Sequence, residues 1–209
     1  MILGEHVDKK AIALLSDGID SPVACHLALK QGYDLVAITY DNEPFSSPEN
    51  LEITKRILMR LSELHERPMK LYVIKNGENL RQIIGTLSPR TRSYVCVLCK
   101  RAMVRLANDI AEREGAAYLV TGENLGQVAS QTLDNMIVIS KASKRHIIRP
   151  LLCMDKLEIE KIAKEIGTYE LSIEPKGGCG AVPRYPQTHA DSLLVEELEK
   201  DIELMLELE

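Results

Sequence analysis

The stretch AIALLSDGIDSPVACHLALK, residues 11–30, decides the fold of this chain. It begins with an apolar run at residues 11–15, which predicts a short buried strand. The polar turn SDGIDS, residues 16–21, follows the strand, and PVA at residues 22–24 begins a helix. A strand that runs through a glycine-containing turn into a helix is typical of α/β proteins.

The rest of the chain repeats this alternation of strand and helix. Further strand-like runs lie at residues 35–40, 70–74, 117–121 and 147–149. The alternation predicts an α/β fold with a doubly wound, parallel, five-stranded sheet, which binds ligands beyond the carboxyl ends of its strands. Two predicted helices, one between strands and one after the last strand, carry apolar stripes with the spacing i, i+3, i+4 and i+7. The stripes lie at Met103, Leu106, Ala107 and Ile110, and at Ile159, Ile162, Ala163 and Ile166.

The composition is that of an ordinary soluble globular protein. Hydrophobic residues make up 45% and charged residues 27% of 209 residues, which excludes disordered, collagen-like and disulfide-scaffold proteins. No apolar run approaches the roughly 18 residues that span a membrane, and the first ten residues lack an apolar leader. We therefore expect a cytoplasmic protein.

The net charge of −5 is unevenly distributed. Residues 189–209 hold eight acids and one lysine, and their apolar spacing predicts an acidic C-terminal helix after a main domain at residues 1–188. This helix either packs on its own domain or pairs with a second copy in a homodimer. Residues 81–108 and 141–149 contain arginines and lysines without any acid, so they form an RNA-binding patch or solvated helix faces.

The turn at residues 16–21 has the properties of a phosphate site. Backbone N–H groups and the positive end of a helix surround an anion at such a turn. Ser16, Gly18 and Ser21 are candidate donors, and Asp20 is a candidate partner for Mg²⁺ or its water shell. A capped turn, with Asp20 or Ser21 as N-cap and Pro22 in the first helical position, explains the same residues, and both interpretations stay open.

Other candidate nucleotide contacts lie at the ends of predicted strands or in the segments that follow them. A glycine after a strand permits close approach of a nucleotide, and a lysine in the first turn of a helix can reach a phosphate oxygen. Surface amides and a solvated lysine are the alternative interpretations. These candidates are Thr39, Tyr40, Thr121, Gly122, Gln127, Gln131 and Lys156.

Five cysteines in a chain without an export leader favour reduced, metal-bound or catalytic thiols over disulfides. Cys96 and Cys99 form a C-x-x-C in a basic segment that favours thiolates. Two thiols are too few for a zinc or iron–sulfur site, so a third ligand must come from elsewhere, unless the pair is a redox disulfide or plain core thiols. Cys179 lies in the flexible KGGCG loop at residues 176–180, whereas Cys25 and Cys153 are expected in the core.

Longer strings reveal a resemblance to a known family. The turn resembles the SGGxDS pyrophosphate loop of PP-loop ATP pyrophosphatases, and IDSPVA at residues 19–24 resembles the tRNA 4-thiouridine synthetase family, ThiI. The strings TGENLGQVASQTLDN at residues 121–135 and RPLLCMDK at residues 149–156 continue the resemblance. So does the segment from IGTY at residues 166–169 to CG at residues 179–180. Together these matches cover most of residues 11–185.

The resemblance implies an adenine nucleotide alpha hydrolase-like fold that uses ATP and Mg²⁺ to thiolate a tRNA uridine with sulfur from a donor. It places Asp20, Lys156 and Cys179 at the reaction, with Cys179 handling the sulfur. Similarity to archaeal members implies that Cys96, Cys99 and Cys179 hold a [4Fe–4S] or [3Fe–4S] iron–sulfur cluster, with zinc as the rival metal.

The sequence departs from the family in two places. Asp17 stands where the family has a glycine, so its carboxylate points away from the phosphates, binds a cation or weakens ATP binding. Only ten residues precede the first strand, so we expect a bare catalytic domain without the family's THUMP portion. Its tRNA would then be held by the basic segments, a second copy or another protein.

Two other functions stay open for the same fold. One is a PP-loop adenylating amidotransferase-type subunit that uses ammonia. The other is a nucleotide-binding subunit of a tRNA-modification complex that does not hydrolyse ATP.

Overall fold

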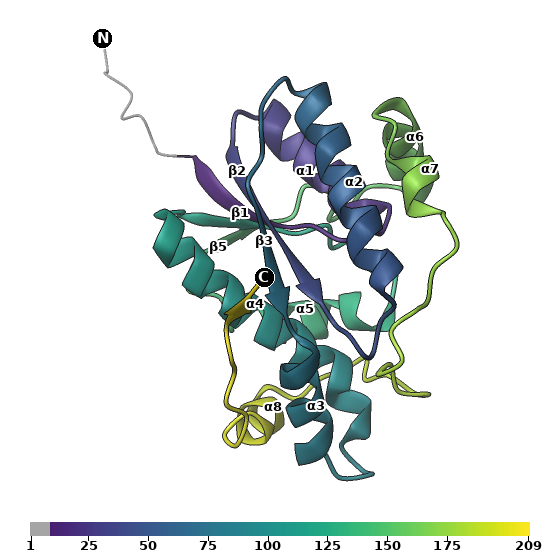
Figure 1. Ribbon diagram of the computed structural model, residues 1–209. Coiled ribbons are helices and arrows are strands. Elements are labelled where there is room, and N and C mark those ends of the chain that lie inside the picture. Colours follow the sequence, from purple (N-terminus) through teal and green to yellow (C-terminus); the bar gives the residue numbers. More distant parts are fainter. Residues whose placement is uncertain (1–8) are drawn as a thin grey trace.

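The computed structural model describes residues 9–209, so the N-terminal residues on which the expected lack of a leader depends lie outside the described part. Its centre is one sheet with the strand order β5-β4-β1-β2-β3-β6 (Figure 1). The strands are β1 (Lys10–Leu14), β2 (Asp34–Asp41), β3 (Leu71–Lys75), β4 (Tyr118–Val120), β5 (His146–Ile148) and β6 (Glu207–Leu208).

The first five strands pair in parallel, which confirms the predicted α/β doubly wound sheet. The central strands are buried on both faces, which explains why β1 and β2 are continuous apolar runs. The strand order reverses beside β1, which has β4 on one side and β2 on the other. Doubly wound sheets bind their ligands at this switch point.

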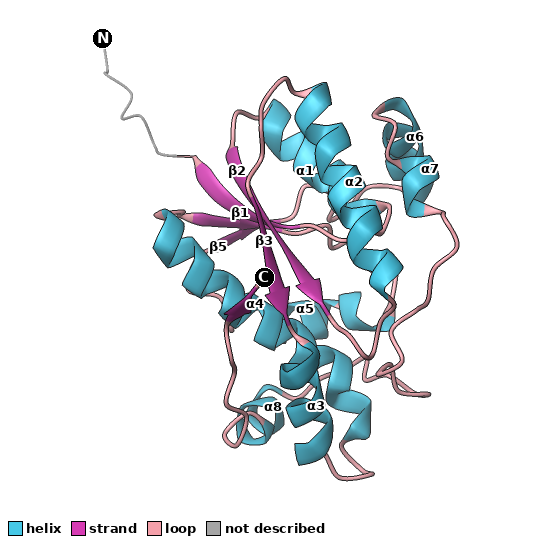
Figure 2. Ribbon diagram, in the orientation of Figure 1, coloured by secondary structure: helices cyan, strands magenta, loops and turns pink. Residues whose placement is uncertain are grey.

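Helices cover both faces of the sheet (Figure 2). Each layer encloses a hydrophobic core of its own against alternate residues of the strands. None of the helices within residues 9–209 is long and apolar enough to cross a membrane. One layer holds α1 (Asp20–Lys30), α2 (Pro48–Leu64), α6 (Lys156–Glu165) and α7 (Tyr169–Ser172), and the other holds α3 (Gly77–Thr86), α4 (Val95–Glu114), α5 (Leu133–Ser140) and α8 (Ser192–Leu198).

The predicted apolar stripes form the inner faces of α4 and α6. Leu106 and Ile110 of α4 are fully or almost fully buried, as are Ile159 and Ala163 of α6. Both ends of α6 are capped. At its start the Asp155 carboxylate accepts the Leu157 N–H at 2.8 Å, and after its end Gly167 adopts φ +75°, which stops the helix.

The prediction of one acidic helix over residues 189–209 is wrong beyond Leu198. After α8, the tail extends and β6 pairs antiparallel with β3, which adds a sixth strand. Leu204, Leu206 and Leu208 alternate along this segment and pack against the chain's own core. Alternation with period two is a strand pattern, and it competes with the helical spacing in this sequence.

Candidate functional site

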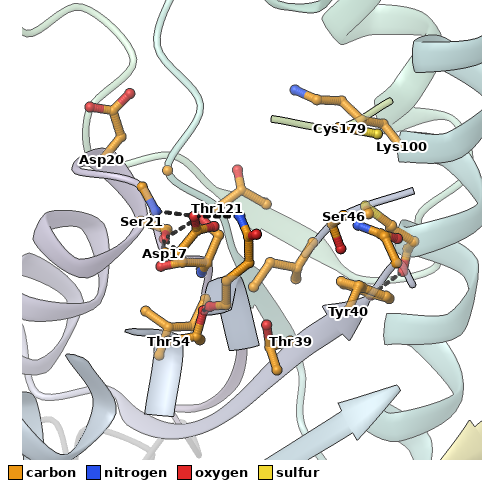
Figure 3. A pocket seen from close by; sticks show the side chains of 18 of the residues that line it. Asp17, Asp20, Ser21, Thr39, Tyr40, Ser46, Thr54, Lys100, Thr121 and Cys179 are labelled. Atoms are coloured by element: carbon orange, nitrogen blue, oxygen red, sulfur yellow. Dashed lines mark hydrogen bonds between the residues drawn. The ribbon is translucent and has the colours of Figure 1, made fainter. Parts of the chain in front are cut away.

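A cavity of about 670 Å³ opens at the carboxyl ends of β1, β2 and β4. In Figure 3, Asp20 and Ser21 lie on one side of it and Lys100 and Cys179 on the opposite side. The cavity thus brings segments from the beginning, middle and end of the chain together. Its lining includes most of the predicted site residues: Ser16, Gly18, Asp20, Ser21, Thr39, Tyr40, Thr121, Gly122 and Cys179.

The turn before α1 is held by its own serines. The Ser16 N–H donates to Ser21 Oγ at 2.8 Å, and the two hydroxyl oxygens are 3.0 Å apart. The N-cap is Ile19, and no side chain of the described residues accepts a hydrogen bond from this helix end. The capped-turn interpretation with Asp20 or Ser21 as N-cap is therefore wrong. An uncapped helix N-terminus at a cavity is suited to binding an anion.

Gly122 lets the segment after β4 pack directly on this turn. A Cβ atom at Gly122 would lie 2.7 Å from both the backbone nitrogen and Cα of Ser21. The contact would also bring it to 2.9 Å from the carbonyl carbon of Asp20. Glycine is therefore required by the approach of two protein segments, whatever the nucleotide itself requires.

Asp20 and Lys156 form an ion pair between two helix starts. The Lys156 Nζ donates to Asp20 Oδ1 in a short hydrogen bond, while the side chains are 36% and 23% exposed. Asp20 is the first residue of α1 and Lys156 the first of α6. Lys156 reaches the cavity through Asp20, so the structure brings the two predicted catalytic residues together.

Asp17 binds a cation, which was one of its three expected fates. Its Oδ2 lies 2.8 Å from the Lys176 ammonium and accepts a hydrogen bond from Asn50 Nδ2 at 2.9 Å. Both partners also line the cavity. The carboxylate at the glycine position of the family loop is therefore neutralised within the site.

Glu123 is a charged cavity residue that the sequence analysis did not single out. Its carboxylate accepts hydrogen bonds from Arg149 Nε at 2.8 Å and Lys100 Nζ at 3.3 Å. Burial opposes its ionisation, but the charges of Lys100 and Arg149 outweigh burial, so the pKa of Glu123 lies below its ordinary value. The signal in the sequence was an acid directly after the Thr121-Gly122 pair, between two acid-free basic segments.

The two candidate glutamines lie in different environments. Gln127 is exposed in the turn that follows β4 and is outside the residues that line the cavity. Gln131, in the 3₁₀ helix η2 (Ala129–Gln131), is 8% exposed and lines the cavity. Its Oε1 has no hydrogen-bond partner among the described residues. Of the two, Gln131 is the one in position to meet a ligand.

Cys96 and Cys99 lie in the first five residues of α4, and Cys179 lies on an exposed loop. Burial, and then the nearby Cys179 and Cys96, together raise the pKa of Cys99 to about 12. Burial and then Cys179 also raise the pKa of Cys96. The three thiols are thus close enough to interact, although no three acidic, histidine or cysteine side chains within residues 9–209 stand in metal-binding geometry.

The other two cysteines differ from each other. Cys25 is buried in α1, and burial raises the pKa of its thiol to about 12, which confirms it as a core residue. Cys153 is exposed, so its prediction as a core residue is wrong. It lies in the surface turn between β5 and α6, where no layer of the fold covers it.

The basic segments only partly form a free surface. Arg101, a predicted RNA contact, is 3% exposed and pairs with the buried Glu199, its Nε lying 2.7 Å from Oε1. Arg105 also pairs with Glu199, at 2.6 Å. The prediction fails for Arg101 because the C-terminal tail supplies a buried acid that the local sequence does not show. Exposed cations of the two segments include Arg90, Arg92, Lys141 and Lys144.

Comparison with known proteins identifies close relatives. The family described as thiamine biosynthesis protein (ThiI) matches residues 6–204. A probable tRNA sulfurtransferase of Methanobrevibacter smithii is 42% identical over 189 residues, 90% of this chain and 49% of that protein. One of Geobacillus kaustophilus is 39% identical over 93% of this chain and 48% of that protein. The chain spans about half the length of the curated relatives that it matches.

Solved structures with a similar fold were also found. A 4-thiouridine synthetase in complex with RNA and bound ATP is 40% identical, with a TM-score of 0.87 over 92% of this chain and 50% of that one. An NH3-dependent NAD synthetase from Campylobacter jejuni has a TM-score of 0.57 at 17% identity, over 80% of this chain and 68% of that one. The second similarity concerns the fold alone.

Proposed function

The chain belongs to the family described as thiamine biosynthesis protein (ThiI), and we propose that its cavity adenylates a tRNA uridine with ATP and then replaces the activated oxygen with sulfur. One observation carries this proposal. A single cavity joins the uncapped start of α1 and the Asp20–Lys156 pair to Cys179 on the opposite wall. Phosphate, activated carbonyl and sulfur must meet in one place, and this cavity provides it.

The residues of the nucleotide side suit the first step. The uracil carbonyl oxygen attacks the α-phosphorus of ATP and pyrophosphate leaves, so negative charge builds up on phosphate oxygens. N–H groups at the start of α1 and the Lys156 ammonium oppose that charge. Asp20, a carboxylate at the same place, is suited to holding the Mg²⁺ that accompanies ATP.

Cys179 is suited to the second step. It is exposed on a loop flanked by glycines, where its sulfur is accessible to a donor and to the activated base. A sulfur nucleophile attacks the carbon of the adenylated carbonyl, and AMP leaves. The nucleophile is hydrosulfide that a sulfur donor delivers at Cys179: its sulfur bonds to the carbon as the C–O bond to AMP breaks, so the step needs no oxidant or reductant.

An iron–sulfur cluster on Cys96, Cys99 and Cys179 is part of the proposal. Three thiols that interact electrostatically form a soft donor set, which suits iron–sulfur clusters or zinc. Such a cluster would supply an iron without a protein ligand to which sulfide can bind. No three acidic, histidine or cysteine side chains within residues 9–209 stand in metal-binding geometry, so the Cys179 side chain must turn toward α4 to complete the ligand set. Iron and sulfide analysis of anaerobically purified protein distinguishes the cluster from zinc.

The proposed RNA substrate is tRNA, as the similarity to a 4-thiouridine synthetase in complex with RNA supports. The exposed Lys144 is a candidate phosphate contact, and tRNA affinity should fall steeply with salt as phosphate counterions are released. Replacing Lys144 by alanine should weaken binding and flatten the salt dependence. Replacing the exposed Lys161 of α6, which pairs only loosely with Glu165 at 4.0 Å, is the matched control.

Product analysis tests the central proposal. Protein, ATP, Mg²⁺, tRNA and sulfide should yield AMP, pyrophosphate and thiolated uridine in equal amounts. Release of ADP and phosphate would contradict adenylation. An amidotransferase would instead require ammonia and leave the tRNA without sulfur, and a non-hydrolysing subunit would bind ATP without any product.

A further inference from the structure

Lys176 connects the nucleotide turn with the loop that carries Cys179. Its ammonium donates to the backbone oxygen of Asp17 at 2.6 Å and lies 2.8 Å from the Asp17 carboxylate. It also donates to the Ser172 carbonyl oxygen at 2.8 Å. The Lys176 and Asp17 side chains are only 19% and 21% exposed. These contacts join two segments of the cavity wall that are far apart in the sequence.

Asn50 of α2 strengthens the same junction. Its Nδ2 donates to the Asp17 carboxylate at 2.9 Å and lies 3.3 Å from the Gly177 carbonyl oxygen. The Gly180 N–H, one residue beyond Cys179, donates to the Phe45 oxygen at 2.7 Å. The loop from Lys176 to Gly180 is therefore fastened on both sides of its cysteine.

We propose that Lys176 is a positioning residue with two effects: it neutralises Asp17 so that phosphate can enter the turn, and it holds the Cys179 loop against the nucleotide site. The inference rests on the proposed function, because the anion in question is ATP. Asp17 stands in the turn that receives the phosphates, so its negative charge must be balanced before another anion binds nearby. Of the cations in the described part of the chain, Lys176 is the one in contact with it.

The two effects have different requirements, which allows them to be separated. Neutralisation is needed only while Asp17 carries a charge. The loop, in contrast, is held by the lysine itself, through the backbone oxygen of Asp17 as well as its carboxylate. Removing the charge of Asp17 therefore replaces the first effect of Lys176 but not the second.

The test compares four full-length variants with the wild-type chain: Lys176→Met, Asp17→Asn, the double variant of these two, and Lys176→Arg. Calorimetry measures the affinity for a non-hydrolysable ATP analogue with Mg²⁺, and hydrogen exchange measures protection of residues 174–182. Lys176→Met should weaken analogue binding about tenfold, because the uncompensated carboxylate of Asp17 then repels the phosphates, and should speed exchange in the loop. Addition of Asp17→Asn should restore the affinity but leave the loop exchange fast, and Lys176→Arg should retain both properties.

Lys161→Met, on the exposed face of α6, is the control and should change neither measurement. The proposal is overturned if Lys176→Met leaves the loop exchange at the wild-type rate, or if Asp17→Asn fails to restore the affinity that Lys176→Met loses. Failure of the proposed function looks different, because the wild-type chain then either binds no ATP analogue or binds ATP without forming AMP and thiolated uridine. In that case the exchange measurement alone still decides whether Lys176 holds the loop.

Discussion

The two ends of the sheet carry similar charges in different arrangements. At the amino end, one carboxylate, Glu114, accepts hydrogen bonds from Lys10 and Lys70 at 2.7 Å each and from the Tyr72 hydroxyl at 2.6 Å. At the carboxyl end, three acids at the cavity each form an ion pair with a lysine that is distant in the sequence. Those pairs are Asp17 with Lys176, Asp20 with Lys156, and Glu123 with Lys100.

The difference lies in what each set of pairs borders. Three donors from the sheet edge meet at Glu114, outside the residues that line the cavity, and their contribution is to join β1, β3 and α4. Two of the pairs at the carboxyl end, Asp20 with Lys156 and Glu123 with Lys100, lie beside an open cavity, where a phosphate can compete for the lysine and a cation for the acid. The proposed role of Lys176 instead keeps it paired with Asp17. An ion pair beside a cavity is thus a candidate for ligand exchange, whereas a closed cluster stabilises the fold.

The largest expected effect is at Asp20. Replacing Asp20 by alanine should lower the rate of AMP formation by about a hundredfold or more, because charge on the phosphates loses its metal partner. Thermal unfolding should change little, since the Asp20–Lys156 pair is partly exposed. Glu114→Gln is the control from the other end and should retain the rate at pH 7. Equal losses of activity in both variants would contradict the distinction between ion pairs at the cavity and ion pairs at the amino end of the sheet.

The second prediction concerns the cysteines at the same end. Anaerobic protein that holds the proposed cluster should show visible absorption, and serine at Cys96, Cys99 or Cys179 should remove it, because the proposal makes each thiolate a required ligand. Serine at the exposed Cys153 should leave the absorption unchanged. A colourless, active wild-type enzyme with one zinc per chain would contradict this prediction.

The third prediction concerns a pair that is neither at the cavity nor at the amino end. Arg101→Met leaves the buried Glu199 with Arg105 as its one remaining cationic partner within residues 9–209, so the free energy of unfolding should fall by about 3 kcal/mol. Urea unfolding measures the change, and Arg105→Ala, which removes a more exposed partner, should cost less. Unchanged stability with weakened tRNA binding would return Arg101 to the RNA surface that the sequence predicted.

The sequence predicted the parallel sheet and most of the cavity because both depend on local patterns. A buried strand, a polar turn and a helix lie consecutively in residues 11–30, and the carboxyl ends of parallel strands meet at one edge. The stretches that begin at Thr121 and Arg149 resemble the sequence of the family, and they indicated which residues border that edge.

Contacts between distant segments were not predictable in the same way. The partner of Asp17 is 159 residues away, and the partner of Arg101 is 98 residues away in the tail. No spacing rule connects such residues. Alternating leucines in the tail did carry a strand signal, but the edge that they pair with exists only in the folded sheet.

The smallest expected effect is the pH dependence of the Glu114 cluster. Hydrogen bonds from Lys10, then from Lys70 and Tyr72, lower the pKa of Glu114 from its ordinary 4.5 to about 2. A carboxyl whose pKa is lower in the folded state stabilises the protein above its ordinary pKa, and this stabilisation is lost as pH falls through the folded value. Glu114→Gln should therefore lower the free energy of unfolding at pH 7 by about 1 kcal/mol, a modest amount because solvent screens the half-exposed Lys70. The difference between variant and wild type should shrink as the pH is lowered from 4.5 toward 2, in urea unfolding curves recorded at each pH. A difference that stays constant over this interval would show that Glu114 contributes through packing, and the contrast between a stabilising amino end and an exchanging carboxyl end would lose its electrostatic basis.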